Sequence, residues 1–494
     1  MSNFLEELKR RKVFRVSATY GVVAWVIMQI GEVTFPALHL PDWVLTAVVV
    51  ILLIGFPIVT IIAWIFDKTP QGFIKTDASA TKNIDPLDIK IDNHEFTLAC
   101  RWAFPYDHGG VAMHNYYLLQ VMENELDVSL ISSKNEENHS SYHQKGISYS
   151  GISAHLPEIY WRIAKNGFIK NGLRSLQDWL ISLALAKAIE SDSPDIIEFM
   201  DIHSDGYAYL KRNPKKYRKT KVIIRSHTPW GLLRSYYSNE ERQGFDAWWS
   251  LQREDYCFQS CDGITTPSQD LKNHLIALYN LPEEKIMVIP NIVDTDHFMP
   301  SSREIDNQPF TFLHVGRFER AKGVVTLTKA FIEFAKVNKD CILINVGVPR
   351  GPVYKYCHEL LKGANMINKV KFTGFVPYKK LPGFYANADA VIVTSEIYES
   401  FSYTVAQAMA CGKPVLSSSI GGIPETLNNG KVGLLYESGN NNELIEGLTY
   451  LYNNNDLRIK LGDDARKYAV EEFSKKKLKN IYLKYYKRIM IGLN

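Results

Sequence analysis

The chain has 494 residues, with 57 basic and 53 acidic residues and a formal net charge of +4. This length exceeds that of one compact domain and predicts two or three. A hydrophobic content of 46% and a charged content of 22% exclude a disordered or collagen-like chain. The near balance of charges excludes the strongly basic surface expected of a nucleic-acid-binding protein, so no nucleic-acid partner is expected.

The six cysteines are scattered, and no pair has the two-residue spacing of a zinc site. Reduced structural thiols in a cytosolic compartment are therefore the favoured interpretation.

The first 75 residues differ in composition from the rest. Residues 18–35 are mostly apolar, although Gln29 and Glu32 interrupt them, and residues 43–66 carry no charged side chain. The second run is long enough to cross a hydrocarbon layer of ~30 Å. The pattern predicts a two-helix transmembrane hairpin over residues 1–75.

The flanking charges orient this hairpin. Five basic residues lie between positions 9 and 15, none lies between positions 36 and 42, and Lys68 and Lys75 follow the second span. The positive-inside rule then places both ends in the cytoplasm. A buried core helix is an alternative for the first span alone, because Glu32 is costly in lipid. A signal peptide is the other alternative and fits poorly, because no small-x-small cleavage site follows this span.

The stretch FLEELKRRKVFRVSATYGVVAW and the later LPDW resemble an N-terminal membrane module of some bacterial cyclase-like and tetratricopeptide-repeat proteins. The resemblance covers only about the first 75 residues, implies a bacterial origin and assigns no chemistry.

The remaining chain predicts an α/β fold. A polar linker over residues 76–94 is followed by strand-like apolar runs that alternate with helical patterns, which is typical of parallel sheets. The runs are residues 96–100, 127–132, 195–200, 221–226, 263–268, 310–316, 341–347, 369–374, 390–395 and 414–419. They predict two Rossmann-like domains, at 95–295 and 296–475, before a basic helix at 476–494.

The segment HVGRFERAKG follows a predicted strand in the second domain. Gly316 turns the chain there, so Arg317 and Lys322 are expected to point into the crevice where open α/β sheets bind ligands. Two cations suit a diphosphate, because arginine offers a planar fork and lysine a point charge.

The run ESFSYTVAQAMACGKPVLSSSIGGIPE is the most specific motif. Glu399 precedes a helix predicted over residues 401–410, so its carboxylate can accept hydrogen bonds from hydroxyl groups of a ligand. Gln407 lies within that helix, and its amide can both donate and accept hydrogen bonds. Gly421 and Gly422 follow a strand and precede a helix, where glycine lets the backbone approach a phosphate.

The first domain offers weaker signals. Gly109 and Gly110 follow the first predicted strand and can let a loop close over a ligand. His227 follows the strand KVIIRS, although a lone histidine in such a place is as often structural.

Together these motifs resemble the family 4 retaining glycosyltransferases, over roughly residues 95 to 475. The resemblance implies the GT-B architecture, in which two Rossmann-like domains face a cleft. It also implies catalytic roles for Arg317, Lys322, Glu399 and His227. The donor-binding residues that it implies are Gly109, Gly110, Gly316, Gly374, Phe375, Val376, Ser400, Phe401, Ser402, Gln407, Gly421 and Gly422.

The chain departs from the family pattern at two positions. The family has glutamate where this chain has Gln407, and glycine where it has Ser402. An amide still hydrogen-bonds a ribose but carries no charge, so the strength of that contact stays open.

The sequence Asp294-Thr295-Asp296 is the metal–diphosphate motif of a different glycosyltransferase architecture. Here it lies at the join between the domains, and a structural role in anchoring the crossing is favoured. No metal and no other cofactor is expected.

The resemblance therefore predicts transfer of a sugar, with retention, from a nucleoside-diphosphate donor to a hydroxyl of a glycan or lipid-linked acceptor. The expected location is the inner membrane, with the catalytic domains in the cytoplasm. A non-catalytic membrane-anchored nucleotide-sugar sensor is the alternative. A phosphorylase of similar architecture would need a lysine that holds its cofactor, and no motif in the sequence supports one. The C-terminal helix, with Tyr482, Tyr485 and Tyr486, either packs across the domains or contacts a membrane surface.

Overall fold

The computed structural model describes residues 94–101, 109–133, 147–152, 170–190, 193–237, 244–302 and 309–492. The predicted hairpin spans, residues 18–35 and 43–66, lie outside these ranges. Within the described ranges, every helix is too short or too polar to cross a membrane.

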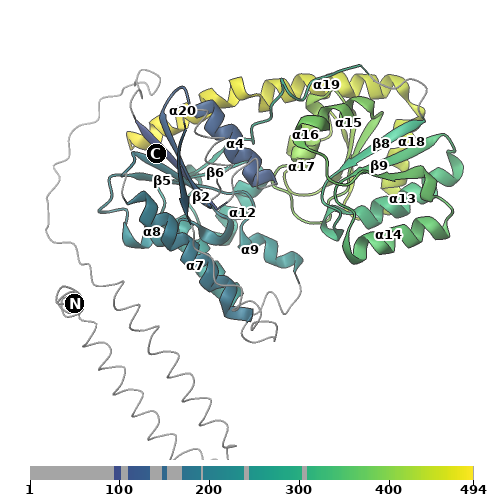
Figure 1. The fold of residues 1–494 in the computed structure, drawn as a ribbon. Helices are drawn as coiled ribbons and strands as arrows, with labels where there is room; N and C mark the ends of the chain where they lie inside the picture. The colour runs from purple at the N-terminus through teal and green to yellow at the C-terminus, as the bar shows by residue number, and fades with distance from the viewer. Residues whose placement is uncertain are drawn as a thin grey trace, which may run out of the picture. The chain divides into compact units, whose positions relative to one another are not determined.

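The first domain is built on a seven-stranded sheet in which every neighbouring pair is parallel, in the order β3-β2-β1-β4-β5-β6-β7 (Figure 1). Its strands are β1 (Glu95–Ala99), β2 (Asp127–Ser133), β3 (Ser148–Ile152), β4 (Ile196–Met200), β5 (Lys221–Arg225), β6 (Gly263–Thr266) and β7 (Ile286–Val288). The central strands β1, β4, β5 and β6 are almost wholly buried, as expected for a sheet covered by helices on both faces.

Two groups of helices cover this sheet. On one face α4 (Gly110–Met122) and α20 (Lys475–Met490) share a hydrophobic core with β1, β2 and β4. On the other face the core is formed with α7 (Lys170–Ile189), α8 (Tyr207–Arg212), α11 (Phe245–Ser260) and α12 (Gln269–Tyr279). The short helix α9 (Trp230–Leu233) follows β5.

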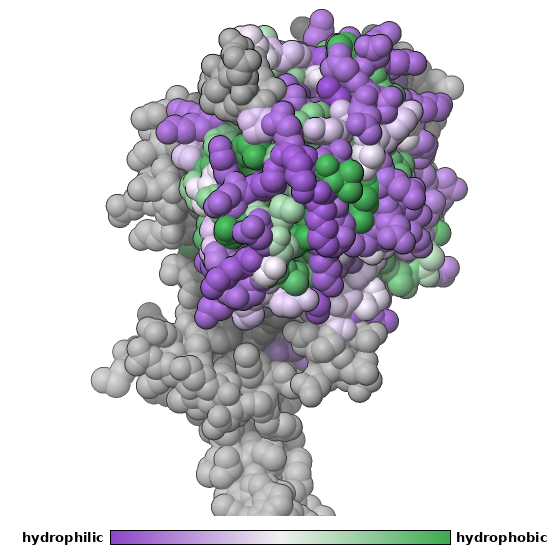
Figure 2. All heavy atoms as spheres, turned by 90° about the vertical axis from the view of Figure 1, so that its right-hand side faces the viewer, coloured by the Kyte–Doolittle hydropathy of each residue, from purple (hydrophilic) through white to green (hydrophobic). Residues whose placement is uncertain are grey.

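The second domain has a six-stranded parallel sheet in the order β10-β9-β8-β11-β12-β13. Its strands are β8 (Phe310–Val315), β9 (Cys341–Val346), β10 (Val370–Phe372), β11 (Ala390–Val393), β12 (Val415–Ser419) and β13 (Leu434–Glu437). The covering helices are α13 (Val324–Val337), α14 (Gly351–Gly363) and α18 (Asn441–Asn453) on one face, and α15 (Leu381–Asn387), α16 (Tyr403–Ala410) and α19 (Asn455–Phe473) on the other. Figure 2 shows one end of this domain, where hydrophilic side chains separate small hydrophobic patches.

All ten predicted strands are confirmed, with ends that shift by at most two residues. Three further strands, β3, β7 and β13, were not predicted. Each forms an edge of its sheet and is at most five residues long, so its burial is partial and its apolar pattern is weak.

The C-terminal helix α20 returns to the first domain. Tyr482, Tyr485 and Tyr486 are all buried in the core that α20 shares with α4 and β1, and the Tyr486 hydroxyl donates to Glu198 at 2.8 Å. The tyrosine face of this helix therefore packs on the first domain, which confirms one of the two alternatives predicted for it.

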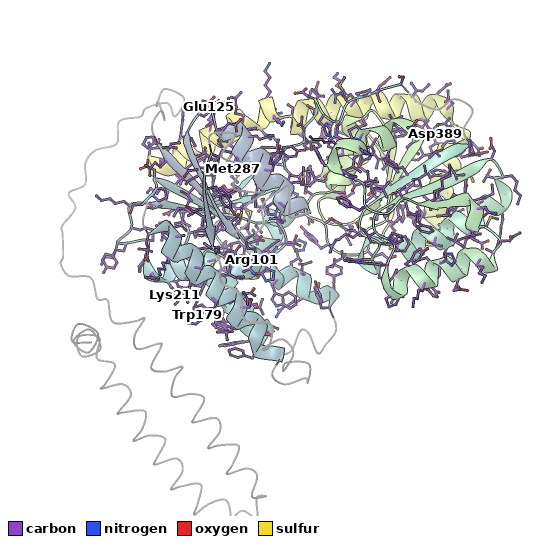
Figure 3. All side chains as sticks on the ribbon, in the orientation of Figure 1. Arg101, Glu125, Trp179, Lys211, Met287 and Asp389 are labelled. Carbon is purple, nitrogen blue, oxygen red and sulfur yellow. The ribbon has the colours of Figure 1, made fainter. Side chains whose placement is uncertain are left out.

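Buried ion pairs also brace the ends of the first domain's strands. Arg101, labelled in Figure 3, follows β1 and lies between the sheet and α7. Its guanidinium donates to Asp178 of α7 at 2.8 Å and to Asp205, beyond β4, at 2.6 and 2.8 Å. The pKa of Asp178 is lowered, because hydrogen bonds and charge from His203 and Arg101 outweigh the cost of burial.

Candidate functional site

Tight glycine turns follow three neighbouring strands of the second sheet. The amide of Gly316 donates to Val346 O at 2.9 Å, and the amide of Gly347 donates to Gly374 O at 3.0 Å. A Cβ atom on Gly347 would lie 1.9 Å from Gly316 O, so only glycine allows these turns to stack. Gly316 and Gly374 were predicted from the sequence and Gly347 was not, although its position at the end of the predicted strand at 341–347 was the available signal.

Exposed apolar side chains lie beside these turns. Phe375 is 58% exposed and Val348 is 44% exposed, while Val376 is partly buried. Such a surface at the carboxyl edge of a parallel sheet can stack against a planar base. The structure therefore leaves Phe375 accessible for the role implied by the family resemblance.

Lys322 and Glu399 come together at the same edge. The Lys322 ammonium contacts Glu399 Oε1, and the Ser395 hydroxyl donates to the same oxygen at 2.8 Å. The two side chains are 27% and 15% exposed. This ion pair joins two of the predicted catalytic residues, which lie 77 positions apart in the chain.

Backbone contacts fix the two loops that carry this pair. The Thr394 hydroxyl donates to Lys322 O at 2.8 Å, and the amide of Glu396 donates to Ala321 O at 2.9 Å. Gly323 has φ +65°, and a Cβ atom there would lie 1.6 Å from Thr394 O. Because β8 and β11 are neighbours in the sheet, their following loops meet.

Arg317 does not join Lys322. Its side chain is 74% exposed and lies 3.3 Å from Glu319, in its own loop. The structure therefore does not bring the two cations together, and the role of Arg317 at a diphosphate stays a prediction. The guanidinium keeps most of its hydration here and pairs with the nearest carboxylate.

Helix α16 begins two residues later than predicted. Ser402 is the N-cap residue, its hydroxyl accepts from the amide of Val405 at 3.4 Å, and its backbone is extended. Serine is preferred at this position because it satisfies a free amide of the first turn. Ser400 and Phe401, which were expected near the helix start, precede the cap and are buried with it.

Gln407 points into the second domain's core. Its side chain is 6% exposed, and its Oε1 accepts from the Tyr385 hydroxyl at 3.1 Å. The predicted ribose-binding amide is thus engaged by a buried tyrosine of α15.

The Gly421–Gly422 turn packs against the backbone of Glu399. Gly421 has φ +56°, and a Cβ atom there would lie 2.4 Å from Glu399 O. The amide of Gly422 donates to Glu399 O at 2.8 Å. The Gly422 amide therefore holds the backbone of Glu399, and the following helix α17 (Ile423–Thr426) has four residues. The donor-binding role of Gly421 and Gly422 stays a prediction.

The first domain meets α16 through its own glycines. Gly109 caps α4 with φ +144°, and a Cβ atom on Gly110 would lie 3.4 Å from the ring of Tyr403. The amino ends of α4 and α16 therefore lie side by side. The intervening loop, residues 102–108, is outside the described part of the chain.

His227 lies behind this meeting point. It is buried, its amide donates to both carboxylate oxygens of Asp201 at 3.1 Å, and its ring lies edge-on to His114 at 4.9 Å between centroids. Burial and the charge of Arg225 hold the pKa of His227 well below its usual value, so the ring is neutral at pH 7. Among the described residues, nothing hydrogen-bonds its Nε2.

Two buried carboxylates hold the loop that carries His227. Asp201 binds the amide of His227, and Glu254 of α11 accepts from the amides of Trp230 at 2.6 Å and Gly231 at 2.9 Å. Burial raises the pKa of Asp201 to about 6 and that of Glu254 to about 7. The sequence analysis identified neither residue, nor His114, because their role depends on contacts with distant parts of the chain.

Hydrogen bonds across the two domains bring the carboxyl edges of both sheets together. The Glu425 carboxylate accepts from the amides of Gln269 and Asp270 at the start of α12, each at 2.7 Å. The Tyr398 hydroxyl donates to Asp270 at 2.6 Å, which adds a third contact. A carboxylate at a helix amino end is also favoured by the helix dipole.

Asp294 has the structural role that was favoured for it. It accepts from the amide of His297 at 3.2 Å and pairs with Lys475, at the start of α20, at 2.6 Å. Asp296 is exposed. In the described ranges no three histidine, cysteine or carboxylate side chains gather in a way that could hold a metal ion.

Comparison with protein families matches both domains. The model described as Glycosyltransferase Family 4 matches residues 108–297, and the model described as Glycosyl transferases group 1 matches residues 296–468. Both models describe glycosyltransferases, and they meet where the first domain passes into the second.

Curated relatives agree with the family models. An N-acetyl-alpha-D-glucosaminyl L-malate synthase of Bacillus anthracis is 26% identical over 45% of this chain and 59% of its own length. A D-inositol 3-phosphate glycosyltransferase of Paenarthrobacter aurescens is 26% identical over 46% of this chain and 57% of its own length. The chain thus spans less than three-fifths of the length of these relatives.

Solved structures share the GT-B fold of the described domains. A sucrose-phosphate synthase from Thermosynechococcus elongatus has a TM-score of 0.65 at 18% identity, with 81% of this chain and 99% of that chain covered. An Anabaena protein in complex with UDP-glucose has a TM-score of 0.59 at 18% identity, with 78% and 97% covered. At this identity the likeness establishes the fold alone.

Proposed function

We propose that this chain, both of whose domains match glycosyltransferase family models, transfers a sugar from a nucleoside-diphosphate donor to a hydroxyl acceptor with retention of configuration. The observation that carries the proposal is the meeting of Lys322 with Glu399 at the carboxyl edge of the second sheet. A cation for a diphosphate and a carboxylate for sugar hydroxyls are thereby held side by side, where open α/β sheets bind ligands.

The proposed donor lies along this edge. Phe375 and Val348 stack against the base, and Lys322 neutralises the diphosphate, with Arg317 reaching it from the loop after β8. Glu399 accepts hydroxyls of the sugar. The support is the accessibility of Phe375 and the fixed backbone of the loops around Lys322. An Anabaena structural neighbour with bound UDP-glucose makes UDP-glucose a reasonable first donor to test.

In the proposed reaction the bond between the sugar and the diphosphate oxygen breaks as the acceptor oxygen bonds to the same face of the anomeric carbon. The acceptor proton passes to the departing diphosphate oxygen. Lys322 stabilises the charge that develops on the leaving group. Neutral His227 is buried on the first-domain side of the junction, and its Nε2 has no hydrogen-bond partner among the described residues. Its proposed role is to bind a hydroxyl of the donor or acceptor.

The acceptor is proposed to bind the first domain and to belong to the inner membrane, where the predicted hairpin would hold the enzyme with its domains in the cytoplasm. A glycan or lipid-linked acceptor fits that location. No metal is required in this proposal, because Lys322 supplies the charge and Asp294 is engaged by Lys475.

The test uses the full chain solubilised in a mild detergent. UDP release from UDP-glucose without acceptor is measured, and GDP-, ADP- and dTDP-sugars are tested in the same way. Slow release of nucleoside diphosphate by the wild type, with or without a chelator, supports the proposal if it disappears in Lys322→Ala. Binding of a nucleotide sugar with no release, even when membrane extracts supply acceptors, would favour the non-catalytic sensor, for which the comparisons offer no support.

A further inference from the structure

The contact between Lys322 and Glu399 raises a question about the proposed function, on which this inference rests. The two residues are assigned to different parts of one donor, the diphosphate and the sugar. Yet without donor they neutralise each other in a partly buried ion pair. A ligand that needs the charge of Lys322 must therefore compete with Glu399 for it.

The two oxygens of Glu399 are used unequally. Both Lys322 and Ser395 bind Oε1, whereas within the described part of the chain no hydrogen bond reaches Oε2. A sugar hydroxyl can therefore donate to Oε2 while the contacts at Oε1 are intact. Once that hydrogen bond has formed, the negative charge of Glu399 is stabilised without Lys322.

The backbone around Lys322 is held in place, so only the Lys322 side chain can move when a ligand binds. Its carbonyl is bound by the Thr394 hydroxyl, and the glycine that follows it packs against Thr394 O. The carbonyl of Glu399 is held likewise by the amide of Gly422. The ammonium can swing between the carboxylate and a nearby diphosphate, while the two backbones remain in place.

We propose that the Lys322–Glu399 pair makes binding of the diphosphate depend on the sugar. With a nucleotide sugar, hydroxyls of the sugar satisfy Glu399 and release Lys322 to the diphosphate. With a bare nucleoside diphosphate, Glu399 has no such partner and retains Lys322. The pair thus favours the donor over the diphosphate product and promotes release of that product after transfer.

The experiment is a double-mutant cycle on binding, with UDP and UDP-glucose titrated into the full chain in detergent. Glu399→Gln is expected to bind UDP about three- to tenfold more tightly than the wild type, the range for losing one partly exposed competing pair. The same variant is expected to bind UDP-glucose more weakly. In a Lys322→Met background, Glu399→Gln is expected to leave UDP affinity unchanged.

Glu396→Gln is the matched control, since this carboxylate lies in the same loop but contacts Thr326. It is expected to leave UDP affinity as in the wild type. If Glu399→Gln raises UDP affinity equally in the wild-type and Lys322→Met backgrounds, the cause is general charge repulsion and the inference is overturned. An increase of UDP affinity in Glu396→Gln would have the same meaning. Unchanged UDP affinity in Glu399→Gln would also overturn the inference. Those outcomes leave the proposed function standing, whereas a wild type that binds none of the UDP-, GDP-, ADP- and dTDP-sugars overturns both.

Discussion

Lys322 and Arg317 differ in their surroundings although they lie in one loop. Lys322 is largely covered and fixed against Glu399, while Arg317 is mostly exposed and paired with Glu319. Lys322→Ala is therefore expected to cost about 2–4 kcal/mol of transition-state stabilisation, the range for a preorganised charge. Arg317→Ala is expected to cost about 1 kcal/mol or less, as for an exposed ion pair.

The measurement is kcat/KM for donor hydrolysis by each variant. Equal losses would contradict this ordering and would mean that Arg317 stabilises the leaving diphosphate as strongly as Lys322 does.

Gln407 has a structural task whatever its part in binding. Its carbonyl oxygen accepts from the Tyr385 hydroxyl, and both side chains are buried. Gln407→Ala leaves that hydroxyl without its partner and is expected to lower the free energy of unfolding by roughly 1–3 kcal/mol. Gln407→Glu keeps an acceptor for Tyr385 and is expected to be tolerated better.

Urea denaturation of the two variants tests this ordering. If Gln407→Ala is as stable as the wild type, water or another acceptor must satisfy the Tyr385 hydroxyl, and the hydrogen bond to Gln407 contributes little to stability.

At the scale of elements, the site depends on turns that pack against each other. Gly421 has positive φ and presses against the carbonyl of Glu399, so an added methyl group must displace that backbone. Gly421→Ala is expected to reduce donor hydrolysis at least about tenfold, because a shift of about 1 Å at a reacting group is costly. Gly439→Ala is the control, since Gly439 also has positive φ but has nothing within 4 Å of its Cβ position.

Both alanines carry the strain of a positive φ, and Gly421→Ala adds a clash with Glu399 O, so its loss of stability is expected to be the larger of the two. Activity is expected to fall only in Gly421→Ala. A matching loss of activity in Gly439→Ala would point to general destabilisation of the second domain.

At the scale of the whole molecule, the first domain carries a buried polar layer under α4 and α20. Glu198 on β4 is fully buried near Arg225 and accepts from Tyr486. Burial raises the pKa of Glu198 to about 7 from its usual 4.5. The folded state then binds this proton more tightly than the unfolded state, so the free energy of unfolding falls as pH rises from about 4.5 to 7.

One pKa unit corresponds to about 1.4 kcal/mol, so this group lowers stability by at most roughly 3 kcal/mol across that window. Glu198→Gln is expected to reduce the pH dependence of stability between about pH 4.5 and 7, as measured by denaturation at several pH values. Glu472→Gln, at an exposed ion pair with Lys477, is expected to leave it unchanged. If Glu198→Gln keeps the wild-type slope of stability against pH, that pH dependence would be assigned to Asp201 or Glu254.

The topology of the full chain is a separate prediction, because its spans lie outside the described residues. A reporter fused after Gly72 is expected to be active only in the cytoplasm, since basic residues flank the two spans on one side. Periplasmic activity at that position would contradict the hairpin.

Much of the architecture could be predicted because strand runs and their following glycines are local patterns. Ten apolar runs became ten strands, and Gly316, Gly374 and Glu399 all lie at one sheet edge because parallel strands end on the same side. The start of α16 was displaced only because Ser402 caps the helix rather than lying inside it. Short edge strands such as β3 carry too little apolar pattern to be recognised.

By itself the sequence determined the fold class, the order of the elements and the loops that meet at the site, since these depend on residues close together in the chain. Tertiary structure alone decided which side chains in those loops touch. It paired Lys322 with Glu399, left Arg317 in solvent, directed Gln407 to Tyr385 and set His114 against His227. A side chain's direction depends on what packs around it, and those neighbours come from distant parts of the chain.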